Sequence, residues 1–303
     1  MLTSNVCFGI IFFFQTTVGI LANFFLLLLY ILNFLRNYKS RPLFLILTQL
    51  ILANITMLVS KGSPEVLHAF EMNNFLDDIG CKMMFFIYRI AHGLSICFTC
   101  LLCIFQAIII SPNNSTLSEF KARLPEYIPS YCLFCWILNL LIEIPVPIFI
   151  RQPRINTNNS FESNILYCSL GMFVEIYFIM TALRNVLCVG IMLWSSSYMV
   201  VLLHRHHQQV QNIHSTSFLS RVPVEIRATQ TILLLMGIFV CFYLLHSITL
   251  ISVTYLDKNG QWLVISPFLS LSFSTLCPFV LLPQAPKHNC ILWTRKDADS
   301  ILS

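Results

Sequence analysis

Charge is what this sequence has least of. Only 10% of its 303 residues are Asp, Glu, Lys or Arg, whereas soluble domains average about a quarter. Hydrophobic residues make up 57% of the chain, and that much apolar sequence on a water-soluble globule would leave large exposed apolar patches. The composition therefore excludes an ordinary soluble domain and favours an all-α integral membrane protein.

Internal repeats, low-complexity tracts and linkers are also lacking, so we expect a single domain over residues 1–303. Lys and Arg are missing before Arg36, which removes the charged leading region of a secretory signal peptide. The apolar run at 6–35 is also too long for a signal-peptide core. We expect this run to be a spanning helix that directs the chain to the membrane.

Signals for chemistry are scarce. Glu143 is a lone carboxylate in an apolar run with no identifiable base or nucleophile to partner it, so we predict no enzyme and no cofactor. Cysteine pairs such as Cys97 and Cys100 imitate metal-ligand spacing, but a thiolate site needs about four ligands. The histidine run 204–207 fits a solvated loop. The basic clusters lack interleaved aromatics, which argues against nucleic acid.

Long apolar runs are abundant, and each is long enough for a helix to cross a bilayer, which takes about 20 residues. They cover residues 6–35, 43–60, 83–110, 127–150, 173–203, 228–255 and 262–282, before a short cytoplasmic tail at 283–303. The pattern predicts a seven-transmembrane-helix bundle in the lipid bilayer.

The basic residues indicate how the bundle is oriented. With the N-terminus outside, eleven of the Lys and Arg residues fall in inner segments and five in outer segments, while Arg89 and Arg184 lie within apolar runs. Basic residues concentrate on the cytoplasmic side of membrane proteins. We therefore predict an outside N-terminus and a cytoplasmic C-terminus.

The third run carries a long motif, Arg89-x-x-x-Gly93-Leu94-Ser95-Ile96-Cys97, which continues to Ser111-Pro112. It resembles the third-span signature of the vomeronasal type-1 (pheromone) receptors, which are seven-span G-protein-coupled receptors of rhodopsin-like architecture. Further matches occur along the chain at Arg41-Pro42-Leu43, Tyr167-Cys168-Ser169, His214-Ser215 and Pro278-Phe279-Val280-Leu281.

The resemblance implies a plasma-membrane receptor of vomeronasal or olfactory sensory neurons. It would bind a small pheromone-like ligand and activate a heterotrimeric G protein of the inhibitory type. Phe105-Gln106-Ala107 replaces the acidic–Arg–aromatic triplet of the wider class, and Asn54 stands where many members carry a sodium-binding aspartate. The standard residues therefore do not explain the activation switch.

Two alternatives predict other features. A bitter-taste-type receptor lacks the Gly93–Cys97 and His214-Ser215 signatures. A small-solute transporter predicts paired repeats and charges at the bilayer midplane, and the sequence shows neither.

The resemblance also implies particular residues at the two membrane surfaces. A disulfide between Cys81 and Cys168 would tie the third span to the second outer loop. The sequon Asn158-Asn159-Ser160 in that loop predicts glycosylation at Asn158. The expected G-protein contacts are Gln106, Arg123, Arg205, His206, His214 and Arg227.

Aromatic and ionisable residues in the outer halves of the spans predict a ligand cavity, since ionisable groups in spans usually face a cavity or each other. The predicted ligand-binding residues are Tyr88, Arg89, His92, Arg184, Phe242, Tyr243 and His246. The alternative is that both arginines snorkel to the headgroups. Glu175 is the only nearby carboxylate on the fifth span and neutralises at most one arginine, which predicts a ligand with an acceptor group on an apolar body.

Overall fold

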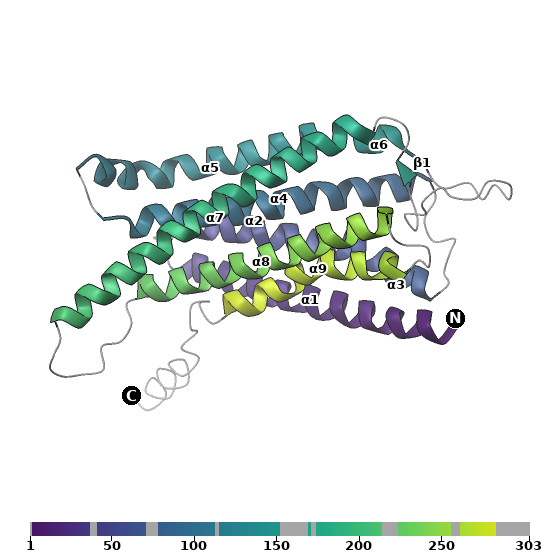
Figure 1. Ribbon diagram of the computed structural model, residues 1–303, viewed down its shortest axis with the longest axis horizontal. Helices are drawn as coiled ribbons and strands as arrows, with labels where there is room; N and C mark the ends of the chain where they lie inside the picture. Colours follow the sequence, from purple (N-terminus) through teal and green to yellow (C-terminus); the bar gives the residue numbers. More distant parts are fainter. Residues whose placement is uncertain are drawn as a thin grey trace, which may run out of the picture.

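The computed structural model describes residues 2–36, 41–70, 78–112, 115–151, 169–170, 174–213, 224–255 and 261–282. The predicted tail at 283–303 lies outside these ranges. Long helices run nearly alongside one another over the length of the molecule (Figure 1). The helices of the first half are α1 (Leu2–Arg36), α2 (Arg41–Met57), α3 (Ser63–Ala69), α4 (Asp78–Ile110), α5 (Ser115–Glu143) and α6 (Pro145–Phe149). Those of the second half are α7 (Val174–Ile213), α8 (Val224–Tyr255) and α9 (Gln261–Leu281).

We call the end of the bundle that holds α6 the outer end, following the orientation predicted from the basic residues. A short antiparallel pairing closes it, in which β1 (Ile150–Arg151) lies against β2 (Ser169–Leu170). The start of α5 and the end of α7 lie at the opposite, inner end (Figure 1).

The second span is longer than the predicted 43–60, because α2 continues into α3 through a π-helical turn, Leu58–Gly62. Within the turn, the Ser60 hydroxyl donates to the Thr56 carbonyl at 2.6 Å. Gly62 is required there, since an added Cβ would lie 2.5 Å from Thr16 Oγ1 on α1. The turn also places the Lys61 ammonium 5.7 Å from the centre of the Tyr88 ring on α4.

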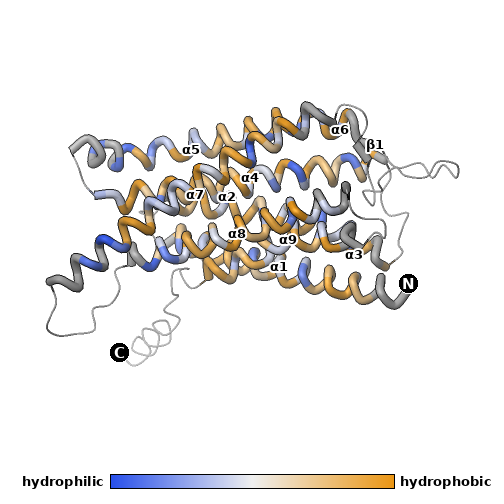
Figure 2. Tube along the Cα trace, viewed as in Figure 1, coloured by the Kyte–Doolittle hydropathy of each residue, from blue (hydrophilic) through white to orange (hydrophobic). Residues whose placement is uncertain are grey.

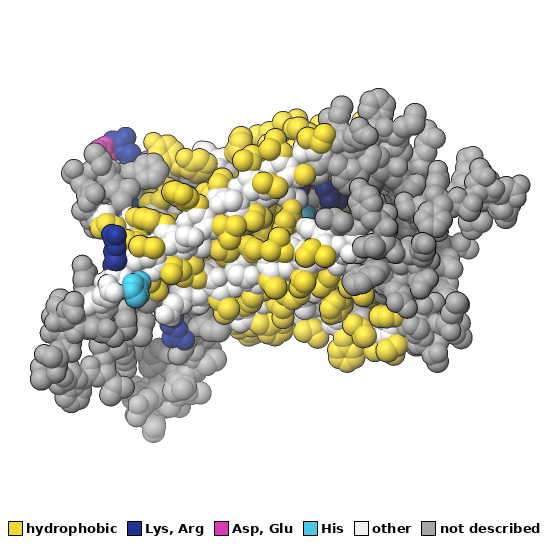
Figure 3. Space-filling view, viewed as in Figure 1, with side chains coloured by type: hydrophobic (Ala, Val, Ile, Leu, Met, Phe, Trp, Pro, Cys, Tyr) yellow, Lys and Arg dark blue, Asp and Glu magenta, His cyan; other side chains and the backbone are white. Residues whose placement is uncertain are grey.

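The surface of the bundle is apolar along the middle of its length. Six helices in the described residues are long and apolar enough to cross a membrane, and Ile265–Leu281 is a shorter apolar helix. Large hydrophobic side chains such as Phe14, Leu133 and Trp194 are exposed. On the face drawn in Figure 3, hydrophobic side chains cover much of the middle of the bundle. Hydrophilic positions gather at the inner ends of α5 and α7 (Figure 2). The predicted seven-helix membrane bundle is confirmed.

Helix α4 is the centre of the bundle. In its apolar stretch 72% of the residues are buried, against 22% in α1, α7 and α8. It contacts α2, α5, α7 and α8, and Phe98, Leu94 and Leu102 are among its fully buried side chains. Lys121 of α5 donates to the Ile109 and Ser111 carbonyls, so it supplies partners at the inner end of α4 that the helix itself lacks.

A seam of buried polar side chains joins four helices beside the core. Asn23 of α1 donates to the Ser274 carbonyl of α9 at 2.9 Å and to the carbonyl of Gly19, one turn earlier in α1, at 2.8 Å. Asn54 of α2 accepts hydrogen bonds from the Ser95 hydroxyl of α4 at 3.1 Å and from the Ser274 hydroxyl at 3.2 Å. One amide oxygen therefore links α2, α4 and α9.

Replacing Asn54 with alanine should destabilise the bundle, because the buried Ser95 hydroxyl loses its acceptor and the Ser274 hydroxyl keeps only the weak acceptor Met57 Sδ. An unsatisfied buried polar group costs about 1–3 kcal/mol. The check is the thermal midpoint of purified Asn54→Ala. The matched control is Thr56→Ala on the same helix, whose hydroxyl, within the part of the chain that the structure describes, bonds only the Leu52 carbonyl of its own helix. Equal midpoints for the two variants would contradict the linking role of Asn54.

Candidate functional site

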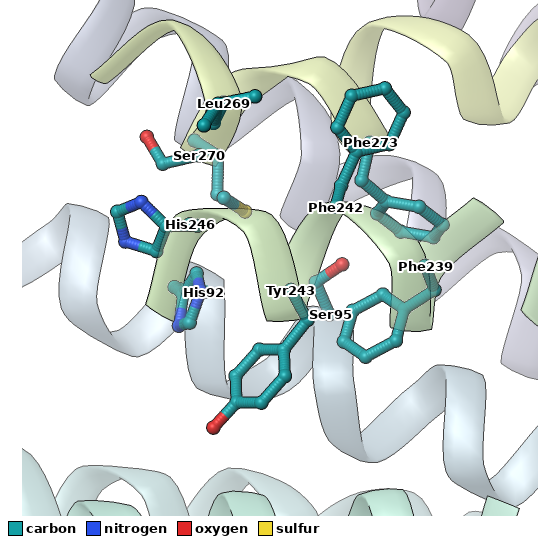
Figure 4. A pocket seen from close by; sticks show the side chains of 10 residues that line it. His92, Ser95, Phe239, Phe242, Tyr243, His246, Leu269, Ser270 and Phe273 are labelled. Atoms are coloured by element: carbon teal, nitrogen blue, oxygen red, sulfur yellow. The ribbon is translucent and has the colours of Figure 1, made fainter. Parts of the chain in front are cut away.

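A small cavity lies between α4, α8, α9 and the end of α2 (Figure 4). Its lining is mostly aromatic with a few polar groups: Met57, His92, Ser95, Phe239, Phe242, Tyr243, His246, Leu269, Ser270 and Phe273. The cavity volume is about 30 Å³, whereas pockets for small molecules usually measure about 300–1,000 Å³. In this conformation the cavity is therefore too small for a ligand of that size.

Two imidazoles mark one end of the pocket. His92 of α4 and His246 of α8 lie close together there, away from the rings of Phe239, Phe242 and Phe273 (Figure 4). His92 Nδ1 is buried and has no hydrogen-bond partner among the described residues. His246 Nδ1 lies 3.4 Å from the Ser266 hydroxyl, at the long limit for such a bond. A polar group on a ligand would satisfy the imidazole that lacks a partner.

Aromatic rings shape the other end. Phe239 meets Phe273 edge to face, with ring centroids 4.9 Å apart and planes at 88°. Phe239 also stacks on Tyr243 at 6.1 Å, in the same helix and four residues away. These rings give the pocket an apolar wall suited to a hydrocarbon or aromatic body.

A buried ion cluster lies on another face of α4, between α4, α5 and α7. Glu143 is fully buried and accepts from the Tyr177 hydroxyl at 2.6 Å, from Arg184 Nη1 at 3.1 Å and from Arg89 Nε at 3.4 Å. Arg184 also donates to Asn139 Oδ1 at 2.8 Å. One carboxylate thus meets two guanidinium groups inside the bundle.

Some of the predicted ligand residues line the pocket, and the others lie beside it or in the ion cluster. His92, Phe242, Tyr243 and His246 line the pocket, and their role in binding stays a prediction. Tyr88 packs behind it, with its ring centroid 6.0 Å from that of His92. The predicted set did not include the other residues that line the cavity: Met57, Ser95, Phe239, Leu269, Ser270 and Phe273. Phe239 stands three and four residues before Phe242 and Tyr243, a spacing that could have revealed it.

The expected surroundings of the arginines need correction. Both Arg89 and Arg184 pair with Glu143 inside the bundle, so neither reaches toward the headgroups as the snorkelling alternative required. The expected partner Glu175 has a side chain outside the described set. Glu143 is the single carboxylate of this cluster among the described residues, and its partners are the two arginines, which the sequence analysis did not connect with it. Its place in an apolar run was the available signal, since a buried charge needs a counter-charge.

The inner end differs from expectation at Gln106. Its side chain is only 3% exposed and donates from Nε2 to the Thr229 hydroxyl of α8 at 3.0 Å, so in this conformation it offers no surface to a partner. Arg123, Arg205 and Arg227 are exposed, and Arg123 pairs with Glu119 at 2.9 Å. His206 lies in α7 with an undescribed side chain.

Three predicted surface features fall partly or wholly outside the described residues. Asn158 and His214 lie outside them, and so does Cys168. Cys81 is disulfide-bonded and buried, and β2 begins at the residue that follows Cys168. The Cys81–Cys168 pairing and glycosylation at Asn158 stay predictions.

The comparison with known proteins decides the family. Residues 6–292 match the model of the vomeronasal organ pheromone receptor family. The chain belongs to the vomeronasal type-1 receptor family. Its members are G-protein-coupled chemosensory receptors, so the chain is a multi-pass plasma-membrane receptor and not an enzyme.

Individual relatives are similar in sequence to this chain over nearly its whole length. Human vomeronasal type-1 receptor 1 is 39% identical over 278 residues, covering 90% of this chain and 79% of the relative. Human vomeronasal type-1 receptor 4 is 37% identical over 288 residues, covering 93% and 96%. Olfactory receptor class A-like protein 1 of Danio rerio is 31% identical over 285 residues, covering 92% and 89%.

The ion cluster explains a glycine in the third-span signature of this vomeronasal type-1 receptor. A Cβ added to Gly93 would overlap Asn139 Oδ1 and would lie 2.5 Å from Arg184 Nη1. The Arg184 guanidinium therefore lies directly against the α4 backbone, and only glycine leaves it room. The signature residue and the buried charges depend on each other.

Gly93→Ala should lower the thermal midpoint of the purified receptor and its delivery to the cell surface. The added methyl group has to displace Asn139 or Arg184, and overpacking of this kind costs roughly 1–3 kcal/mol. Gly237→Ala on α8 is the matched control, because nothing lies within 4 Å of a Cβ there. It should be neutral or stabilise by about 0.5–1 kcal/mol. Equal tolerance at both positions would refute the close approach at Gly93.

Proposed function

We propose that this receptor binds a small pheromone-like chemosignal in the pocket between α4, α8 and α9, and activates a heterotrimeric G protein of the inhibitory type at its inner end. The observation that carries the proposal is the pocket itself. Aromatic rings and two imidazoles converge in the outer half of the bundle, while the exposed Arg123, Arg205 and Arg227 lie at the inner end. The receptor would act in the plasma membrane of vomeronasal or olfactory sensory neurons.

The small cavity suggests how binding and signalling are coupled. An agonist larger than a few water molecules has to push α4, α8 and α9 apart. It therefore binds an expanded conformation better than the closed one, and this difference in affinity shifts the population. Helices α4 and α8 that form the pocket are also joined at their inner ends by the hydrogen bond between Gln106 and Thr229.

We further propose that Cys81 and Cys168 form the outer disulfide and that Asn158 carries a glycan. The exposed basic residues of the inner segments, with His206 and His214, would form the G-protein face. Gln106 would reach that face only after α4 and α8 separate at their inner ends.

The proposal is tested in cells that express the receptor with an inhibitory G protein, using cyclic-nucleotide responses to fractionated secretions. Once an active fraction is found, Phe242→Ala should raise its half-maximal concentration about tenfold or more at matched surface expression. Burial of a Phe ring contributes about 1.5–3 kcal/mol. Leu244→Ala, two residues away and 51% exposed on the outside of α8, should leave the midpoint unchanged. Equal shifts for both variants would place the binding site elsewhere.

Thr229→Val should increase agonist-independent signalling, because it removes the partner of Gln106 and keeps the shape of the side chain. A hydrogen bond contributes about 0.5–1.5 kcal/mol, which corresponds to roughly a two- to twelvefold change in the conformational equilibrium. Ser197→Ala is the control, because that hydroxyl bonds only the Leu193 carbonyl of its own helix. Basal nucleotide exchange on the G protein is the measurement. Unchanged exchange in Thr229→Val would show that this bond does not hold the resting conformation.

A further inference from the structure

Arg184 and Arg89 both contact Glu143, but they differ in burial and in how closely they pair with it. The Arg184 side chain is 3% exposed, and its Nε and Nη1 reach Asn185, Asn139 and Glu143. The Arg89 side chain is 19% exposed and touches Glu143 only through Nε, at 3.4 Å. Arg184 is therefore the close counter-ion of Glu143.

Among the side chains that the structure describes, the cluster carries one positive charge more than its single carboxylate, Glu143, can balance. Arginine stays protonated at any accessible pH, and Glu143 neutralises one unit of charge. The nearby Lys61 has its own partner in Glu65, at 2.9 Å. A buried charge without a counter-ion is costly, so the excess has to be met by water or by an acidic group near Arg89, the more accessible arginine.

The terminal nitrogens of Arg89 are available to a further partner. Among the described residues, no hydrogen bond reaches its Nη1 or Nη2, and neither atom belongs to the fully buried groups that lack a partner. The guanidinium is nevertheless fixed, because Nε donates to the Tyr177 hydroxyl at 2.7 Å and its carbon lies 5.4 Å from the centre of that ring. A held, planar fork of donors matches the geometry of a carboxylate, sulfate or phosphate.

Arg89 also has the right position relative to the pocket. It precedes His92 by three residues on α4, so it lies about one helical turn, roughly 4.5 Å, further out. His92 and His246 line the pocket, and Arg89 lies on the next outward turn of α4.

We propose that Arg89 binds the acidic group of the ligand, whose apolar body lies inward against Phe242 and Phe273, while Arg184 only balances Glu143. The ligand class is therefore an organic acid, a carboxylate or sulfate, with a compact hydrocarbon or aromatic body. This inference rests on the proposed ligand pocket and adds the charge of its ligand.

The probes are 4-phenylbutyrate and the uncharged 4-phenylbutanol, which share a phenyl ring on a four-carbon chain and differ in the acidic group. Apparent affinities come from the rise in the melting temperature of purified receptor with probe concentration. We expect the acid to bind tighter than the alcohol. Arg89→Gln should lower the affinity for the acid about 10- to 150-fold and leave the affinity for the alcohol unchanged. Equal affinities in the wild-type receptor, or an acid preference that survives Arg89→Gln, would overturn the inference.

Two further variants keep the test decisive. Arg89→Lys keeps the charge but loses the planar fork of donors, so it should retain part of the preference for the acid. This variant keeps the inference testable if Arg89→Gln does not fold. Lys121→Gln removes a positive charge at the inner end and should retain all of it. An Arg89→Lys receptor that keeps the full preference would exclude recognition by the fork.

Lipid headgroups are the other source of an acidic group. The receptor is therefore compared in nanodiscs of phosphatidylcholine with and without phosphatidylglycerol. Stabilisation by phosphatidylglycerol that disappears in Arg89→Gln, without any preference for the acid probe, would assign Arg89 to lipid and overturn the ligand inference. These assays contain no G protein. If the acid binds through Arg89 but neither it nor secretion fractions drive nucleotide exchange, the signalling proposal fails while this inference stands.

Discussion

The contact between Glu143 and two arginines is the constraint on which the outer half of the bundle depends. A carboxylate and two guanidinium groups inside an apolar bundle are stable only as partners, because each alone would remain a desolvated charge. Their pairing fixes α5 and α7 against α4 at Glu143, Arg184 and Arg89. It also dictates the glycine at position 93, since the Arg184 guanidinium lies against the α4 backbone.

Helix α4 connects this constraint to the pocket because its faces serve different purposes. Arg89 and Gly93, four residues apart, face the ion cluster, whereas His92 and Ser95 line the pocket. Ser95 also reaches the polar seam through Asn54. A ligand that displaced α4 from α8 would therefore act on a helix whose neighbouring face is held by charge. This arrangement favours movement of α8 and α9, whose contacts with the pocket are mostly aromatic and carry no ion pair among the described residues.

The same helix ends in a neutral contact where the wider receptor class has a charged one. Gln106 meets the Thr229 hydroxyl, and Ser111 shares a 3.0 Å hydrogen bond with the Tyr198 hydroxyl of α7. Neutral hydrogen bonds are individually weak, at about 1 kcal/mol each. If these bonds hold the resting conformation, as proposed above, the energy that they contribute at this end is small.

The membrane class and the seven helices were predicted from composition and run length, because every span that lies in lipid needs a long apolar run. The family was predicted from the third-span motif. Spacing of four residues also identified Phe242 with His246, since helical neighbours are local in sequence. The charge balance of the site could not be found in this way. Glu143 stands 54 positions from Arg89 and 41 from Arg184, and nothing local in the sequence brings them together. Only the packing of α5 and α7 on α4 decided which arginine is buried against the carboxylate and which keeps its donors open.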